Sequence, residues 1–308
     1  MSPTPLTPTA AVARIYTLLR SAFGANLPDA VDLGVMVQLL NEKAFAKGAT
    51  LRLPRELEIR GFEGALVRNP GTDDWGIFYK PHPRCRERQR FTIAHEMGHF
   101  VLHRERVSEF RCEMRGVNNG QDADKQIEKE ANAFASNLLM PADLFRDGLG
   151  DQRKVDLRVI GSLAQRFGVS MEAACLRFVE LTNQRAILLR WDSGILEYEA
   201  RSKKAVLSRA RFKVPNTMQE PVPGSVSGDP LTLQCLEGVK QTARMWCPEE
   251  RTYMSLRECK HTHVERERML TLLILESMEP RFGDRTHEDE HEQDTSERFR
   301  ASGQFPVH

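Results

Sequence analysis

The sequence predicts an α+β protein, with helices dominating the first 180 residues or so and strands the region after them. Apolar residues recur at helical spacing in most segments up to about residue 181. A pair of strand-like runs interrupts them at 62–80, and further runs follow from about residue 185. The chain has 308 residues, 40% hydrophobic and 28% charged, which is typical of a globular protein with two or three domains.

Charge and cysteine usage narrow the class of protein. The formal net charge is +1, so the molecule as a whole is not a polyanion binder, although a local basic patch remains open. Six cysteines in a chain of this length indicate reduced thiols and a cytosolic protein. The N-terminal apolar stretch lacks a basic region before it and is broken by Arg14 and Arg20, and no window has the length of a membrane span. We therefore expect a cytoplasmic protein that does not enter a membrane.

The first elements precede a predicted hairpin. Residues 1–10 contain three prolines and predict a disordered lead-in. Residues 11–24 predict a helix closed by Gly24, and 29–49 a second helix opened by Asp29 or Asp32. In 62–80, two apolar runs joined by Asn-Pro-Gly predict the hairpin.

Helices follow the hairpin. Residues 86–104 predict one helix, 115–126 a polar loop, and 127–140 a strongly amphipathic helix that ends at Pro141. Residues 158–181 predict two helices around a Gly-Val-Ser turn. Four strand-like runs then indicate a separate α+β domain: AILLRW, ILEYEA, YMSLREC and MLTLLILE.

The string HEMGH at 95–99 places chemically useful groups on one helix. Residues four apart lie about 6 Å apart along the axis and face the same way, so His95 and His99 can each offer a nitrogen to one zinc ion. Glu96 can face a water on that zinc and take its proton. Gly98 leaves room for another segment to approach. Two hydrogen-bonded core histidines are the alternative.

A zinc site of this kind needs a third protein ligand. His103 continues the spacing, but it lies about 12 Å along the helix from His95, too far for both to hold one ion. Carboxylates on 127–140 are better placed. Glu128 and Glu130 flank its apolar stripe on opposite edges, so periodicity does not separate them. Glu105, Glu109 and Glu113 lie in a segment that is less clearly amphipathic.

The stretch FTIAHEMGHFVLH, followed after a polar interval by EKEANAFASNLLMP, resembles the ImmA/IrrE family of bacterial metallopeptidases. The agreement covers roughly 30–145. The resemblance implies a mainly helical, zincin-like peptidase core with a small sheet. In that family the glutamate directly before the Ala-Asn pair binds zinc, which implies Glu130 as the third ligand. It also implies an edge strand that pairs with extended substrate, for which the hairpin at 62–80 is the candidate.

The domains expected on this basis run in order along the chain. A helix-turn-helix-like segment often follows the family's peptidase core, and 158–181 fits that description. Its arginines, Arg158, Arg166 and Arg177, are offset by two glutamates, so direct nucleic-acid binding is the less favoured alternative. The predicted divisions are a lead-in (1–10), a zinc metallopeptidase domain (11–150), a helical segment (151–183), an α+β domain of unknown role (184–280) and a polar disordered tail (281–308).

A second zinc site is not favoured. Cys235, Cys247, Cys259, His261 and His263 contain no C-x2-C knuckle, so buried thiols and surface histidines are the better interpretation.

Two hypotheses follow. The first is a zinc endopeptidase with one Zn²⁺ on His95, His99 and Glu130 and with Glu96 as base. Its expected substrate, implied by the resemblance, is a helix-turn-helix transcriptional repressor cut in a stress or mobile-element response. The second is a zinc-containing regulatory module that sequesters a repressor without cleaving it; an intact Glu96 argues against it.

Overall fold

The computed structural model describes residues 6–24, 27, 29–42, 45, 48–58, 62–105, 109–113, 122–151, 155–212, 219–263 and 267–276. The predicted tail, half of the lead-in and most of the loop at 115–126 lie outside these ranges. The chain forms two compact units. Among the described residues, one unit holds those up to Leu144 together with Gln165–Ser170, and the other holds Phe145–Ala164 and those from Met171 to residue 276. Both units combine helices with a sheet, which confirms the α+β class.

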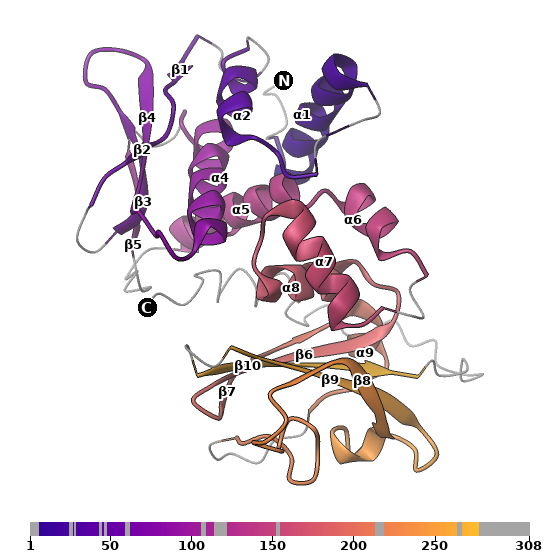
Figure 1. Cartoon of the computed structure of the whole chain (residues 1–308). Helices are drawn as coiled ribbons and strands as arrows, with labels where there is room; N and C mark the ends of the chain where they lie inside the picture. Colours follow the sequence, from indigo (N-terminus) through magenta and orange to yellow (C-terminus); the bar gives the residue numbers. More distant parts are fainter. Residues whose placement is uncertain are drawn as a thin grey trace. The chain divides into compact units, whose positions relative to one another are not determined.

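The first unit contains four helices and a five-stranded sheet among its described residues (Figure 1). The helices are α1 (Pro8–Phe23), α2 (Leu33–Leu40), α4 (Arg86–Leu102) and α5 (Asp122–Leu139). The strands are β1 (Thr50–Leu51), β2 (Arg55–Glu56), β3 (Phe62–Arg68), β4 (Asp74–Tyr79) and β5 (Glu109–Glu113). α4 packs on β3 and β4 and also on α5, and α1 packs on α5.

Local sequence explains where the first helices start and stop. Thr7 caps α1, so the helix begins inside the predicted lead-in, and Gly24 closes it with a positive φ of 69°. Asp32 caps α2 through the amides of Gly34 and Val35. α2 ends at Leu40, well before the predicted end, because the side chain of Asn41 turns to bond the backbone N–H and C=O of Leu51.

The predicted hairpin at 62–80 is confirmed, with β3 antiparallel to β4. Its predicted role as an edge strand is not confirmed. The strand order β1-β4-β3-β5 gives β3 a second partner in β5, while β1 and β2 both pair with β4. β5, which the sequence did not predict, therefore forms the outer border of the sheet on that side.

α4 and α5 approach closely at one point. A Cβ on Gly98 would lie 3.1 Å from Ala131 Cα and 3.2 Å from Phe134 Cβ, so only glycine lets the two helices meet here without displacement. Ala131, Phe134, Ala135 and Leu138 are fully buried, which confirms the predicted apolar stripe of α5. The contact between Gly98 and Ala131 fixes which face of α5 turns toward α4.

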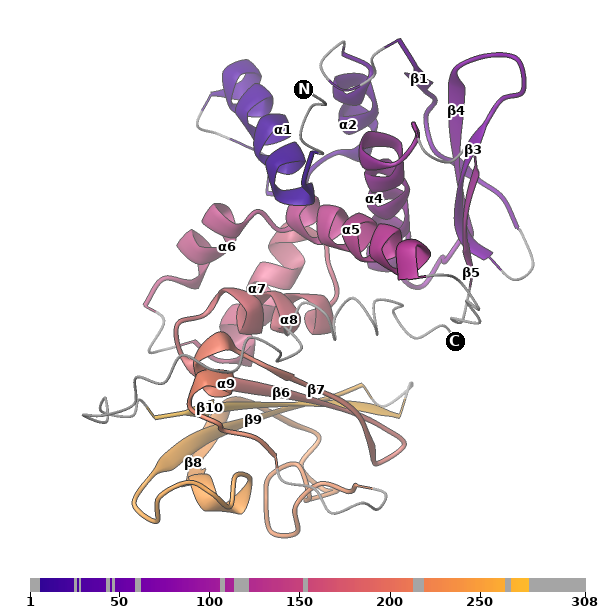
Figure 2. The same ribbon diagram turned by 180° about the vertical axis from the view of Figure 1, so that it is seen from behind.

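The second unit is built on a five-stranded antiparallel sheet (Figure 2). Its strands are β6 (Arg185–Asp192), β7 (Ile195–Arg201), β8 (Gln234–Thr242), β9 (Ser255–His263) and β10 (Arg268–Leu275), in the order β7-β6-β10-β9-β8. The helices of this part of the chain are α6 (Ala142–Leu149), α7 (Leu157–Phe167), α8 (Met171–Leu181), α9 (Lys203–Leu207) and the short 3-10 turn η2 (Ala243–Met245). The bounds of α6 and α7 cross from one unit to the other.

Both faces of this sheet are covered. α8 packs on β6 and β7. Alternate residues of β6, such as Ile187, Leu189 and Trp191, belong instead to an apolar cluster that includes Trp246, next to η2, and Ala205 of α9. β6 is buried along almost its whole length for that reason. The strand-like runs predicted after residue 185 match β6, β7, β9 and β10, and β8 was missed.

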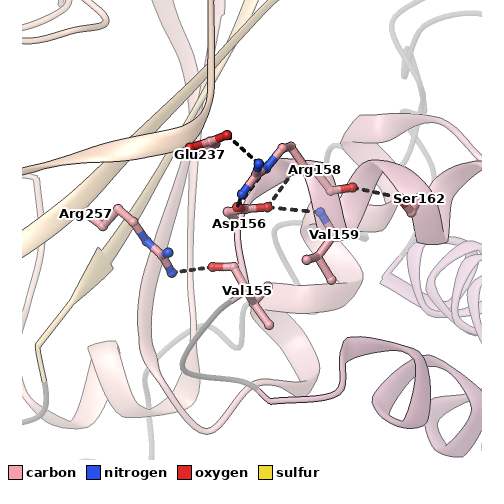
Figure 3. Close-up of polar contacts among 7 residues, drawn as sticks. All are labelled: Val155, Asp156, Arg158, Val159, Ser162, Glu237 and Arg257. Carbon is pink, nitrogen blue, oxygen red and sulfur yellow. Dashed lines mark hydrogen bonds and ion pairs between the residues drawn. The ribbon is translucent and has the colours of Figure 1, made fainter.

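Polar contacts tie the start of α7 to the sheet of the second unit (Figure 3). Asp156 accepts hydrogen bonds from the backbone N–H groups of Arg158 and Val159 at 2.9 and 3.1 Å, which is the pattern of a helix N-cap. The guanidinium of Arg158 joins Asp156 to Glu237 of β8, and Arg257 of β9 donates to the carbonyl oxygen of Val155. These contacts hold the pKa of Asp156 below its usual value, although partial burial opposes the shift.

Among the described helices, none is long and apolar enough to cross a membrane.

Candidate metal centre

The site begins with three side chains of α4, which are almost completely enclosed. His95 is 6% exposed, and Glu96 and His99 are fully buried. One turn of helix separates the histidines, so both imidazoles turn the same way, and their Nε2 atoms lie 2.9 Å apart. The arrangement that the spacing HExxH predicts is therefore present.

Glu128 of α5 completes the cluster. Its Oε2 lies 3.2 Å from His95 Nε2 and its Oε1 lies 3.4 Å from His99 Nε2. Among the residues that the structure describes, these three form the one group of at least three His, Cys, Asp or Glu side chains whose ligand atoms lie within 4.8 Å of one another. The cysteines and histidines of β8 and β9 form no such group within the described residues.

Glu130, the expected third ligand, lies elsewhere. Its Oε2 is 3.0 Å from Nε2 of His103, and its Oε1 accepts a hydrogen bond of 2.8 Å from Gln126. Two positions on a helix differ by about 200° of rotation, so Glu128 and Glu130 cannot face the same point. The rotation of α5 set at Gly98 and Ala131 turns Glu128 toward His95 and His99, and this corrects the expectation for Glu130.

The outer nitrogen of each histidine also has a partner. His95 Nδ1 lies 2.9 Å from Asn132 Oδ1, one turn beyond Glu128 on α5. His99 Nδ1 lies 3.1 Å from His103 Nδ1. His103 is fully buried. Side chains behind the two imidazoles therefore restrict the orientation of both rings.

The pKa values of these groups are shifted in different directions. Burial opposes the charged form of His95, but the Glu128 carboxylate and, more weakly, Glu96 raise its pKa above the usual value. Burial lowers the pKa of His99 to about 4. The two histidines hold the pKa of Glu128 well below its usual range against the effect of burial. These shifts favour the charged form of His95, the neutral form of His99 and the carboxylate form of Glu128.

These donors fit a zinc ion by their chemistry. Two atoms bound tetrahedrally at 2.0–2.1 Å lie roughly 3.3 Å apart. The separations between the nitrogens and the Glu128 oxygens are 3.2 and 3.4 Å, and that between the nitrogens is somewhat shorter. Two imidazoles and one carboxylate are also the ligand set of many catalytic zinc sites.

Part of the chain is similar to known metallopeptidases. Residues 55–179 match the peptidase family described as the IrrE N-terminal-like domain. This part of the chain is similar to the IrrE N-terminal-like peptidase domain. The chain is 34% identical over 96 residues to the radiation response metalloprotease IrrE of Deinococcus deserti, covering 31% of this chain and 33% of the relative. It is 30% identical over 86 residues to the metallopeptidase ImmA of Bacillus subtilis, covering 28% of this chain and 46% of the relative. The chain thus spans a third to less than half of the length of these relatives.

Strand β3 also shapes the surroundings of Glu96. A Cβ on Gly64 of β3 would lie 2.4 Å from Thr92 Cγ2 and 2.7 Å from Glu96 Oε1. Thr92 and Glu96 lie one turn apart on α4, so this strand passes directly over the face that carries Glu96. Gly64 was not recognised from the sequence, because a glycine in a short strand gives no sign of what lies beneath it.

The arginines that might have contacted nucleic acid have acidic partners. Arg166 bonds Asp29 at 2.7 Å, and the buried Arg177 pairs with Glu180 at 2.8 Å. Arg158 bonds Asp156 and Glu237. These ion pairs weaken the case for phosphate binding by 158–181.

Proposed function

We propose that this protein is a zinc-dependent endopeptidase whose metal is held by His95, His99 and Glu128, with Glu96 as general base. The observation that carries the proposal is the convergence of these three donors beside an enclosed carboxylate. When bound, zinc supplies Lewis-acid activation of water and of the scissile carbonyl. The ion could also be manganese or iron, which accept nitrogen and carboxylate ligands as well.

The chain itself supplies the proton transfers. Glu96 follows His95 on α4 and is fully buried, so its carboxylate is held close to the ligands and away from bulk water. It takes the proton of the attacking water and delivers it to the leaving amine. The enclosed surroundings strengthen each of these electrostatic interactions.

The substrate we propose is a cytoplasmic protein, a helix-turn-helix transcriptional repressor, cleaved in a stress response. The name of the Deinococcus deserti relative, a radiation response metalloprotease, supports the stress context. The buried base favours cleavage over sequestration, because a binding module has no use for a carboxylate beside the metal.

Metal content tests the ligand set. We expect one equivalent of zinc in the purified wild-type protein by mass spectrometry and none in Glu128→Ala. A Glu128→Ala protein that retains the full equivalent would refute the assignment.

Proteome-wide mapping of new N-termini tests the activity. Cells that produce the wild-type protein should contain cleavage products that are missing from cells producing Glu96→Gln. Glu96→Gln should still bind zinc, because Glu96 is not among the ligands. Identical N-termini in the two cell types would instead support sequestration.

A further inference from the structure

His103 and Glu130 form a partly buried pair next to His99, and the proposed chemistry does not use this pair. His103 is fully buried at the end of α4, and the Glu130 side chain is 29% exposed. Nδ1 of His103 lies 3.1 Å from Nδ1 of His99, whose other ring nitrogen, Nε2, faces Glu128. A histidine enclosed this completely needs hydrogen-bond partners on its ring nitrogens.

With His103 neutral, the distances allow one placement of the hydrogens. Glu130 Oε2, 3.0 Å from His103 Nε2, is a carboxylate oxygen and can only accept, so His103 carries its hydrogen on Nε2. Nδ1 of neutral His103 is then an acceptor. In this neutral pair, His99 Nδ1, 3.1 Å away, supplies the hydrogen between the two rings.

This placement of the hydrogens determines which nitrogen of His99 can bind a metal. An imidazole with its hydrogen on Nδ1 has its lone pair on Nε2, the atom that faces His95 and Glu128. The opposite tautomer would present an N–H to the metal position and could not bind an ion.

We propose that Glu130 and His103 are positioning residues that fix the ring plane and the Nδ1–H tautomer of His99, so that its Nε2 is ready to bind the metal. This inference rests on the metal site proposed above. Asn132 holds His95 separately, by accepting from its Nδ1 at 2.9 Å. Each metal-binding histidine therefore has its own support, one from an amide and one from a His-Glu relay.

Gln126 extends the relay. Its Nε2 donates to Glu130 Oε1 at 2.8 Å, from one turn earlier on α5. With one oxygen bound by His103 and the other by Gln126, the carboxylate has a defined orientation.

The test compares variants of Glu130 in the full-length chain. Glu130→Leu removes the acceptor of His103, whereas Glu130→Gln keeps an acceptor oxygen. Lys125→Leu, an exposed change on the same helix, is the matched control. Zinc affinity is measured by competition with a chelating dye. The loss of such an outer partner typically weakens metal binding 10- to 100-fold. We expect that loss in Glu130→Leu, near-wild-type affinity in Glu130→Gln and no change in Lys125→Leu.

A second measurement reads the tautomer without metal. Nitrogen-15 NMR of the imidazoles should show His99 with its hydrogen on Nδ1 in the metal-free wild-type protein and a mixture of tautomers in Glu130→Leu. His103→Phe should resemble Glu130→Leu in both measurements. If it fails to fold, the Glu130 variants decide alone.

The outcomes separate the two proposals. Wild-type affinity in Glu130→Leu, or an unchanged His99 tautomer, would overturn the positioning role. If Glu128→Ala binds zinc like the wild type, the metal site is wrong, but the tautomer in the metal-free protein still decides the role of the relay.

Discussion

Substituting Gly64 by alanine tests how tightly β3 is seated over the base. The added Cβ would lie 2.4 Å from Thr92 Cγ2 and 2.7 Å from Glu96 Oε1, well inside normal contact. Gly64 is not among the glycines with positive φ, so alanine is compatible with its backbone. Alanine should then stabilise the fold by about 0.4–1 kcal/mol, because it reduces the conformational entropy of the unfolded chain. Overpacking costs about 1–3 kcal/mol, and a contact of 2.4 Å argues for the upper part of that range, about 2–3 kcal/mol, so the net expectation is a loss of roughly 1–2.6 kcal/mol.

Thermal unfolding of the zinc-loaded protein measures this loss. For a domain of this size, each kcal/mol corresponds to about 2–4 °C in Tm. Thr92→Ser removes the methyl carbon that makes the closest contact, so Gly64→Ala with Thr92→Ser should recover most of the Tm. Cleavage should remain impaired in the double variant, because the contact with Glu96 persists and a displacement of 1 Å can cost about 100-fold in rate. A Gly64→Ala protein that melts at or above the wild-type temperature would refute this account of the packing.

Three further outcomes are expected. Zinc affinity should fall about tenfold per pH unit below the raised pKa of His95, because one proton competes with the metal. Chelator titrations at several pH values should not show a hundredfold fall per pH unit, which would indicate two competing protons, because His99, with a pKa of about 4, is already neutral. Asp156→Ala should lower the free energy of unfolding by about 1 kcal/mol through loss of the α7 cap, and Asp156→Asn should retain most of it, as followed by denaturant titration. Gly161→Ala, whose Cβ would meet only the flexible end of Met171, should raise stability by about 0.5–1 kcal/mol in the same titration, whereas Gly98→Ala should not, because its Cβ would meet backbone.

Local patterns sufficed for much of the fold. The helical spacing of His95 and His99, the apolar stripe of α5 and the hairpin of β3 and β4 each depend on residues close in sequence, and all three are confirmed. The choice between Glu128 and Glu130 depends instead on the rotation of α5 about its axis. That rotation is set by the contact of Gly98 with Ala131, which no periodicity reveals.

Two strands escaped prediction for a related reason. β5 pairs with β3 across more than 40 positions of the chain, and such non-local pairing leaves no local pattern. β8 is an edge strand in which no residue is fully buried, and its register shifts between Cys235 and Val239. Without an inward face of large apolar residues, it lacks the alternation by which strands are recognised.

The order of strands in the second unit bears on how the chain is made. β10 lies between β6 and β9, so the hairpin of β6 and β7 and the pair of β8 and β9 are joined only through it. On the ribosome, this sheet stays in two separate pieces until residues 268–275 have emerged. The segments that carry His95, His99 and Glu128 are synthesised well before that point. A stop codon before residue 268 would therefore expose the edges of both pieces at once, which makes truncated chains candidates for aggregation or degradation.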